Sequence, residues 1–206
     1  MKKLYLIIPI LFIVSCSEQT VYFSGSIGIY PDRIFWAFLE YPPPNFGIVD
    51  NAKVLLDSTT RIPFSGEKNG YYRKGVIGLT YNSLHTIQVE VEDKENIFGT
   101  VKIPSSFEIN APNPIGEGDS LVIRWTHVDE MNTPPEEWRM IVIMGGDTLR
   151  HLGFTITEDE YKIQTGIIDE DTEIIIKAIR YGNLSGGYGN SFFWGVVQKN
   201  KNVTIN

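Results

Sequence analysis

Apolar and polar residues alternate along most of the chain, which is the pattern of strands with one buried face. Ile87, Val89 and Val91 share one face of such a segment, and the polar residues between them share the other. The same alternation gives four further apolar sets: Ala52, Val54 and Leu56; Leu121, Ile123 and Trp125; Trp138, Met140, Val142 and Met144; and Ile174, Ile176 and Ala178. We expect each set to form the core-facing side of a strand.

Clusters of glycine, asparagine and aspartate separate these segments, at residues 68–70, 116–119, 145–147 and 169–171. These residue types tolerate the positive φ of tight turns. Short strands separated by regular turns predict an all-β fold of sandwich type. Residues 136–140 could begin a helix after two prolines, but the β-favouring residues that follow indicate a strand.

A domain boundary is predicted at Pro104, Ser105 and Ser106, between two groups of strands. Pro112 and Pro114 follow closely, and prolines are tolerated in the edge strand that would open a second sandwich. We therefore expect two tandem Ig-like sandwiches, at residues 24–104 and 105–206. A linker of only a few residues predicts a stiff rod of two domains.

The second half resembles a fibronectin type III domain. Residues 121–125 resemble the second strand of that fold with its core tryptophan, and residues 168–178 resemble the turn and the penultimate strand. The glycine-rich residues 186–191 fall where the last hairpin loop belongs. One departure is Ile174, where the family usually has tyrosine. The resemblance implies a fold but no particular function.

The first half resembles the transthyretin-like or carboxypeptidase-regulatory type of sandwich. The residues that carry this resemblance are 52–56, 70–72 and 78–81, which lead into residues 87–91. The combination of both halves resembles uncharacterised envelope lipoproteins. The starch-utilisation accessory lipoproteins, which stack β-sandwiches on a lipid anchor, are a looser comparison.

The N-terminus has the features of a secretory signal: two lysines, an apolar run from Leu4 to Val14, and the small Ser15. The run is too short for a spanning helix, which needs about 20 apolar residues. Residues 13–16 resemble the bacterial lipobox, and Cys16 is the single cysteine. The resemblance implies removal of the signal peptide at residues 1–15, acylation of Cys16, and a lipidated tether at residues 16–23.

Ser17 follows the cysteine where an inner-membrane lipoprotein would carry aspartate, so we expect lipid anchoring in the outer membrane. Removing the signal peptide with its two lysines takes the formal net charge from −7 to −9. This acidity argues against nucleic acid or an anionic lipid surface as a partner. No disulfide is possible with one cysteine, so each domain depends on its own core.

Motifs for catalysis are not found. His85, His127 and His151 are far apart in the sequence and lack metal-ligand spacing, and the one thiol is assigned to lipid. The acidic residues 169–171 could supply oxygen ligands to calcium, but they lack the spacing of the twelve-residue calcium loop. We therefore predict a non-enzymatic protein without metal or cofactor. A hydrolase with an unrecognised site is the weakest alternative.

Large aromatic residues are more informative about function than the search for catalytic and metal-binding motifs. In residues 34–41, the set Phe35, Ala37, Leu39 and Tyr41 would face one way, and the set Ile34, Trp36 and Phe38 the other. A sheet with one buried face cannot bury both sets. Residues 192–194 pose the same problem after a glycine-rich loop that carries Tyr188.

Three interpretations of the surplus aromatics remain: burial in the core or between domains, a platform for sugar rings, and a contact with a protein. The predicted function is a binding or accessory module at the cell envelope, for a protein partner or a glycan. Its candidate contacts are Trp36, Tyr41, Tyr188 and Trp194. The alternative is a structural spacer in an envelope assembly.

Overall fold

The computed structural model describes residues 20–44, 46–66, 71–116, 119–127, 135–144, 147–154, 160–163 and 170–206. Every regular element within these ranges is a strand, as the alternation predicted. The strands are β1 (Tyr22–Ile29), β2 (Arg33–Tyr41), β3 (Gly47–Ile48), β4 (Lys53–Leu56), β5 (Thr60–Ile62), β6 (Phe64–Ser65), β7 (Tyr71–Gly75), β8 (Leu84–Glu90), β9 (Ile97–Lys102), β10 (Phe107–Asn110), β11 (Leu121–His127), β12 (Glu137–Met144), β13 (Asp147–Phe154), β14 (Glu160–Ile163), β15 (Thr172–Tyr181), β16 (Asn183–Ser185) and β17 (Phe192–Val203).

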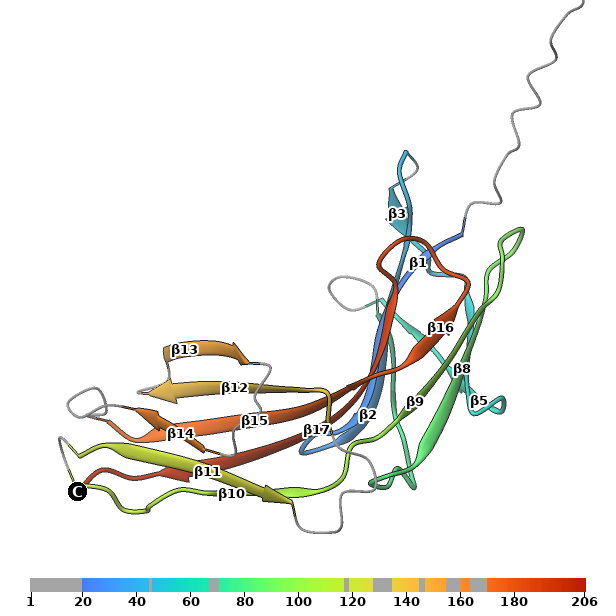
Figure 1. Ribbon diagram of the computed structural model, residues 1–206. Helices are drawn as coiled ribbons and strands as arrows, with labels where there is room; N and C mark the ends of the chain where they lie inside the picture. The colour runs from blue at the N-terminus through green and yellow to red at the C-terminus, as the bar shows by residue number, and fades with distance from the viewer. Residues whose placement is uncertain are drawn as a thin grey trace, which may run out of the picture.

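The second sandwich is an Ig-like, fibronectin type III-like fold (Figure 1). A sheet of order β10-β11-β14 packs against strands of order β13-β12-β15-β17. Trp125 on β11, the second strand of this sandwich, is 1% exposed. Residues 174–178 lie in the penultimate strand, and residues 186–191 lie in the last hairpin, as the resemblance implied. Residues 137–144 form a strand and not a helix.

The first sandwich also has two sheets. One has the order β17-β1-β2-β7-β6, with β3 paired to β2, and the other has the order β16-β9-β8-β4-β5. Alternation in residues 52–56 and 87–91 was correctly assigned to the core, because Val54, Leu56, Ile87 and Val89 are all at most 2% exposed. The likeness of this half to transthyretin-type sandwiches stays a prediction.

The last hairpin of the second sandwich is also part of the first. The early half of β17 pairs in parallel with β1, from Ser24 opposite Phe192 to Ile29 opposite Val197. β16 pairs with β9, so the hairpin contributes one strand to each sheet of the first sandwich. One continuous sheet therefore runs through both sandwiches in the order β13-β12-β15-β17-β1-β2-β7-β6.

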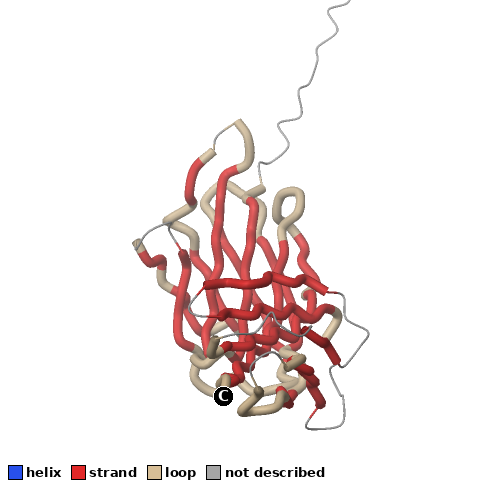
Figure 2. The backbone as a smooth tube through the Cα atoms, turned by 90° about the vertical axis from the view of Figure 1, so that its left-hand side faces the viewer, coloured by secondary structure: helices blue, strands red, loops and turns tan. Residues whose placement is uncertain are grey.

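The connection between the sandwiches is bent. In Figure 1, β15 and β17 curve where they pass from the second sandwich to the first, and Figure 2 shows the strands of the two parts running in different directions. The chain passes from β9, which ends at Lys102, to β10, which begins at Phe107. The two parts therefore do not form a straight rod, and they are joined by the shared strand β17 as well as by the linker.

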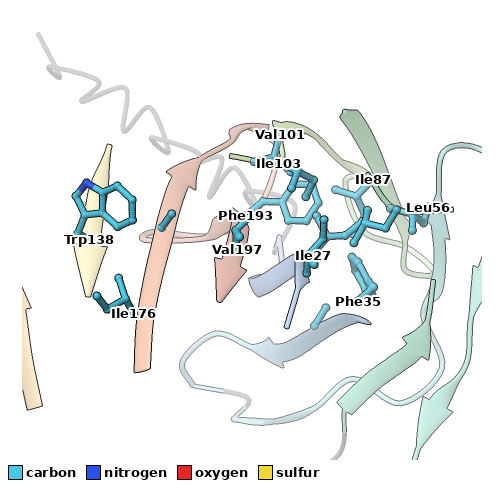
Figure 3. Close-up of a cluster of buried hydrophobic side chains, with 14 of the residues drawn as sticks. Ile27, Phe35, Leu56, Ile87, Val101, Ile103, Trp138, Ile176, Phe193 and Val197 are labelled. Carbon is cyan, nitrogen blue, oxygen red and sulfur yellow. The ribbon is translucent and has the colours of Figure 1, made fainter. Parts of the chain in front are cut away.

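Phe193 anchors the shared hairpin in the core of the first sandwich (Figure 3). It is fully buried and makes edge-to-face contacts with Phe23 and Phe35, with ring centroids 6.2 Å apart in each pair. The loop before β17 is fixed as well: Ser191 Oγ accepts a hydrogen bond from the amide of Phe23 at 3.0 Å, and the amide of Tyr188 donates to the carbonyl of Val21 at 2.9 Å.

Candidate functional site: an aromatic face on the continuous sheet

The outer face of the continuous sheet carries aromatic side chains where the two sandwiches meet. On β2, Phe35, Ala37 and Leu39 are fully buried in the core, so Trp36 and Phe38 must point the other way. On β17, Phe193 is the buried residue, and Phe192 and Trp194 point outward. We call this surface the aromatic face; its members are Tyr30, Trp36, Phe38, Tyr71, Tyr181, Phe192 and Trp194.

Trp36 belongs to a group of rings on β2 and β7. Its ring meets that of Tyr71 edge to face, with centroids 6.3 Å apart and an interplanar angle of 82°. Phe38 packs on the same tyrosine at 5.8 Å. All three side chains are half-buried, so each ring is held by its neighbours and still leaves part of its surface in solvent.

Trp194 belongs to a second group, on β17, β15 and β12. Phe192 stacks on it with centroids 4.2 Å apart and an interplanar angle of 19°, and Tyr181 lies 6.0 Å away. The guanidinium carbon of Arg139 lies 4.8 Å from the ring centroid, within the range of a cation–π contact. The indole nitrogen of Trp194 is buried and has no hydrogen-bond partner among the described residues.

A strip of small residues on β1 separates the two groups. Ser26 stands between the two tryptophans, because it is opposite Trp36 on one side and Trp194 on the other. Strands lie about 4.8 Å apart, so the backbones of the two tryptophans are about 10 Å apart. Tyr30 folds back over Gly28 and bonds to Ser26 Oγ at 3.1 Å. A Cβ at Gly28 would lie 2.5 Å from the backbone oxygen of Val196 and 2.9 Å from the Tyr30 ring, so this position needs glycine.

Charged groups surround the aromatic rings. Arg139 donates two hydrogen bonds to Glu137, at 2.5 and 3.3 Å, and Tyr181 also donates to Glu137. The bonds from Arg139 hold the pKa of Glu137 below its ordinary value, and the same pair raises the pKa of Arg139. Burial, helped by the charge of Arg139, lowers the pKa of Lys177.

A hollow of about 500 Å³ opens on this face and takes residues from both sandwiches. Trp36, Tyr71 and Arg73 line it from the first sandwich, and Lys177 lines it from β15. Tyr30, Pro31, Asp32 and Ile34 complete the lining. This volume is within the usual range for small-molecule sites.

The structure brings together two of the four predicted contacts. Trp36 and Trp194 flank the same strip. Tyr41 belongs to the inward set of β2 and packs against the core, and Tyr188 is 48% exposed on the loop that covers the start of β1. Arg139 and Lys177 were not proposed, although the predicted inward positions 138, 140, 176 and 178 had already placed both residues outward.

His85 lies in an arrangement that resembles a Ser-His-Asp triad. Its Nδ1 is 2.8 Å from Asp57 Oδ2, and its Nε2 is 2.7 Å from Ser83 Oγ. Ser83, however, donates its hydroxyl proton to the carbonyl of Thr80 at 2.6 Å, so that proton is not held for transfer to histidine. Asp57 also accepts a bond from the amide of Thr86. We interpret the group as a structural connection between the β4–β5 turn and β8.

Metal ligation has no candidate site in the described part of the chain, where His, Cys, Asp and Glu residues form no group of three or more able to hold an ion. Residue 169 and the side chains of His127 and His151 lie outside the described residues, so the calcium alternative at residues 169–171 stays open. In the ranges that the structure describes, no helix is long and apolar enough to cross a membrane.

The fold and the site define an all-β protein of two sandwiches with a half-buried aromatic face on their shared sheet. No protein-family model matches the chain, and no curated protein matches its sequence. Similar solved structures include domains d3–d4 of the rat CD45 extracellular region, with 12% identity over 67% of this chain and 71% of that one, at a TM-score of 0.30.

Two further structures are from chicken. The FN1–FN3 domains of CNTN1 match at 9% identity over 90% of this chain and 66% of that one, with a TM-score of 0.30. A segment of two fibronectin type III domains from tenascin matches at 11% identity over 90% and 99%, with a TM-score of 0.32. Structures with TM-scores this low do not support a shared fold or function. The assignment of the sandwich fold therefore rests on the order of the strands in the sheets.

Proposed function

We propose that the chain is a lipid-anchored, non-enzymatic binding module of the outer membrane, and that its aromatic face holds carbohydrate. The observation that carries this proposal is the pair of half-buried tryptophans, Trp36 and Trp194, on either side of a strip of small residues. Sugar rings have apolar C–H faces that pack on aromatic rings, and their hydroxyls suit polar groups such as those of Tyr30 and Arg73 beside the rings.

The rigidity of the face supports this role. Each tryptophan is held by other rings, and the strip between them is fixed by the bond from Tyr30 to Ser26. A surface that is already ordered loses little conformational entropy when it binds a ligand. The face also lies on paired strands and not on a loop, which keeps the spacing of the two ring groups constant.

The proposed anchor sets an orientation. Five residues separate Cys16 from β1, which begins at Tyr22, so a fully extended tether reaches about 20 Å. The β2–β3 hairpin lies beside the start of β1 (Figure 1), and it carries Phe46 and Ile48, which are 78% and 44% exposed. This end would lie at the bilayer, and the hollow at the opposite end of β1 would face away from it.

Affinity gel electrophoresis against neutral polysaccharides tests carbohydrate binding. We expect Trp36→Ala and Trp194→Ala to weaken retardation at least tenfold, because each removes a ring from the face. Phe98→Ala is the matched control, since Phe98 is a 47% exposed aromatic residue on β9 of the opposite sheet. If no polysaccharide retards the wild-type chain and a co-purifying protein shields Trp36, the ligand is a protein and the proposal is wrong.

Metabolic labelling with palmitate tests the anchor. We expect the label on the full-length chain and none on Cys16→Ser, which should leave the membrane fraction. A Cys16→Ser variant that stays membrane-bound after a salt wash would contradict the proposed anchor.

A further inference from the structure

Lys177 is an unusual residue for the position it occupies. It is half-buried on β15, opposite Arg139 on β12, and it lines the hollow beside Trp36. Its ammonium has no ion pair or hydrogen bond among the described residues. Burying a charge without a partner costs free energy, and among the described residues this ammonium is left as an unpaired positive charge.

The surroundings of Lys177 increase this unbalanced positive charge. Arg139 already donates hydrogen bonds to both carboxylate oxygens of Glu137. Arg73 lines the same hollow and has no ion pair among the described residues. Asp32 is the one carboxylate in the lining, against two cations. The hollow is thus locally positive in a chain whose formal net charge is −7.

We propose that the hollow selects an acidic saccharide, with the sugar ring against Trp36 and Tyr71 and an anionic group of the sugar near Lys177 and Arg73. This inference rests on the proposed function and specifies its ligand. An ammonium acts as a point charge, and a guanidinium can donate two parallel hydrogen bonds to a carboxylate or a sulfate. A carboxylate and a sulfate both fit these two cations, so the proposed ligand is a sugar ring with an anionic substituent.

The net negative charge of the chain does not prevent this binding. At an ionic strength of 0.15 M the Debye length is about 8 Å, so charges across the protein are screened from a bound sugar. Lys177 and Arg73 border the hollow itself and act within that distance. The binding assays should therefore be done at 0.15 M salt.

Calorimetric titration of the full lipidated chain in detergent micelles tests the inference with matched polymers. Polygalacturonate and its fully methyl-esterified form share the ring and the linkage and differ in charge. We expect at least tenfold tighter binding of the acid form. Lys177→Met should bring the two affinities together by weakening the acid form alone, and Trp36→Ala should weaken both. Lys102→Met, an exposed lysine on β9, is the control for net charge.

A sulfated galactan and its desulfated form make up the second arm. A preference for the sulfated polymer that Lys177→Met abolishes also supports the inference and assigns sulfate as the anionic group. Equal affinity of the wild type for charged and uncharged forms in both arms overturns it, as does a preference that survives Lys177→Met. Retardation by neutral polysaccharides would then still support the proposed function. Thermal melts of Lys177→Met should match the wild type, which excludes unfolding as the cause.

Discussion

The two sandwiches differ in how the chain supplies their strands. All seven strands of the second sandwich come from one segment between Phe107 and Val203. The first sandwich takes most of its strands from residues 22–102, but β16 and the early half of β17 come from the end of the chain. The strands of the second sandwich therefore come from one stretch of sequence, whereas those of the first come from two.

The borrowed hairpin covers two edges at once. β1 and β9 would otherwise be edge strands with unpaired backbone groups, which are templates for aggregation. β17 covers β1, and β16 covers β9. The same hairpin carries Phe192 and Trp194 to the outer face, so the contact that completes the first sandwich also assembles the aromatic face.

Phe193→Ala gives the largest expected effect, because it removes the ring that holds the borrowed hairpin between Phe23 and Phe35. Truncation of a buried phenylalanine costs about 3–5 kcal/mol. We expect hydrogen exchange to show loss of protection in β1 and β9 before β11. Ile123→Ala, in the core of the second sandwich, is the comparison and should reverse that order. Equal loss in both sandwiches for either variant would mean that they unfold as one unit.

Gly195→Ala tests the point where β17 passes between the sandwiches. A Cβ there would lie 3.1 Å from the carbonyl carbon of Lys102 and against its oxygen, which is backbone and cannot rotate away. Such overpacking should cost about 3 kcal/mol. Gly75→Ala is the matched control, since the nearest atom to a Cβ there is 3.9 Å away. Urea unfolding measures both, and a stable Gly195→Ala would show that the contact can relax.

Alternation in the sequence identified which residues face the core but not which strands pair. The sets around Val54, Val89 and Ile123 were assigned correctly because each depends only on the period of two along one strand. The pairing of β1 with β17 joins residues that are 168 positions apart, such as Ser24 and Phe192. Nothing in either segment alone specifies that partner.

The candidate site likewise depends on strand pairing that the sequence did not specify. Trp36 and Trp194 were proposed for their surplus bulk, but only the parallel pairing through β1 places them on one face. Tyr41 was also proposed as a contact, but it shares the parity of Phe35 and Leu39 and packs against the core with them. Lys177 was on an outward position, but its value as a site residue depends on the hollow, which neither sandwich forms alone.

Tyr72→Phe should have an intermediate effect that is confined to the first sandwich. The Tyr72 hydroxyl donates to the carbonyl of Val49 at 3.0 Å and accepts from the amide of Ala52 at 2.8 Å, and both bonds are buried. Removing it leaves two backbone groups without partners and should cost about 2 kcal/mol. Hydrogen exchange should show faster exchange at Ala52 with β11 unchanged. Unchanged exchange at Ala52 would indicate that water replaces the hydroxyl.

Glu137→Gln should have the smallest effect and the clearest pH dependence. Arg139 holds the pKa of Glu137 below its unfolded value, so the stabilisation is complete above that value, about 4.3, and is lost as the pH falls below it. We expect the variant to be less stable than the wild type by at most about 1 kcal/mol at pH 7, with the difference shrinking towards pH 3.

The control is Glu160→Gln, which removes the pair with Arg124 in the second sandwich. Those two side chains are 49% and 58% exposed, against 15% and 32% for Glu137 and Arg139, so water screens their attraction more strongly. Urea midpoints at both pH values should therefore move less for Glu160→Gln. Equal shifts for the two variants would mean that the pair beside Trp194 is no better shielded than one on an open strand, and the aromatic face would then be wetter than its packing indicates.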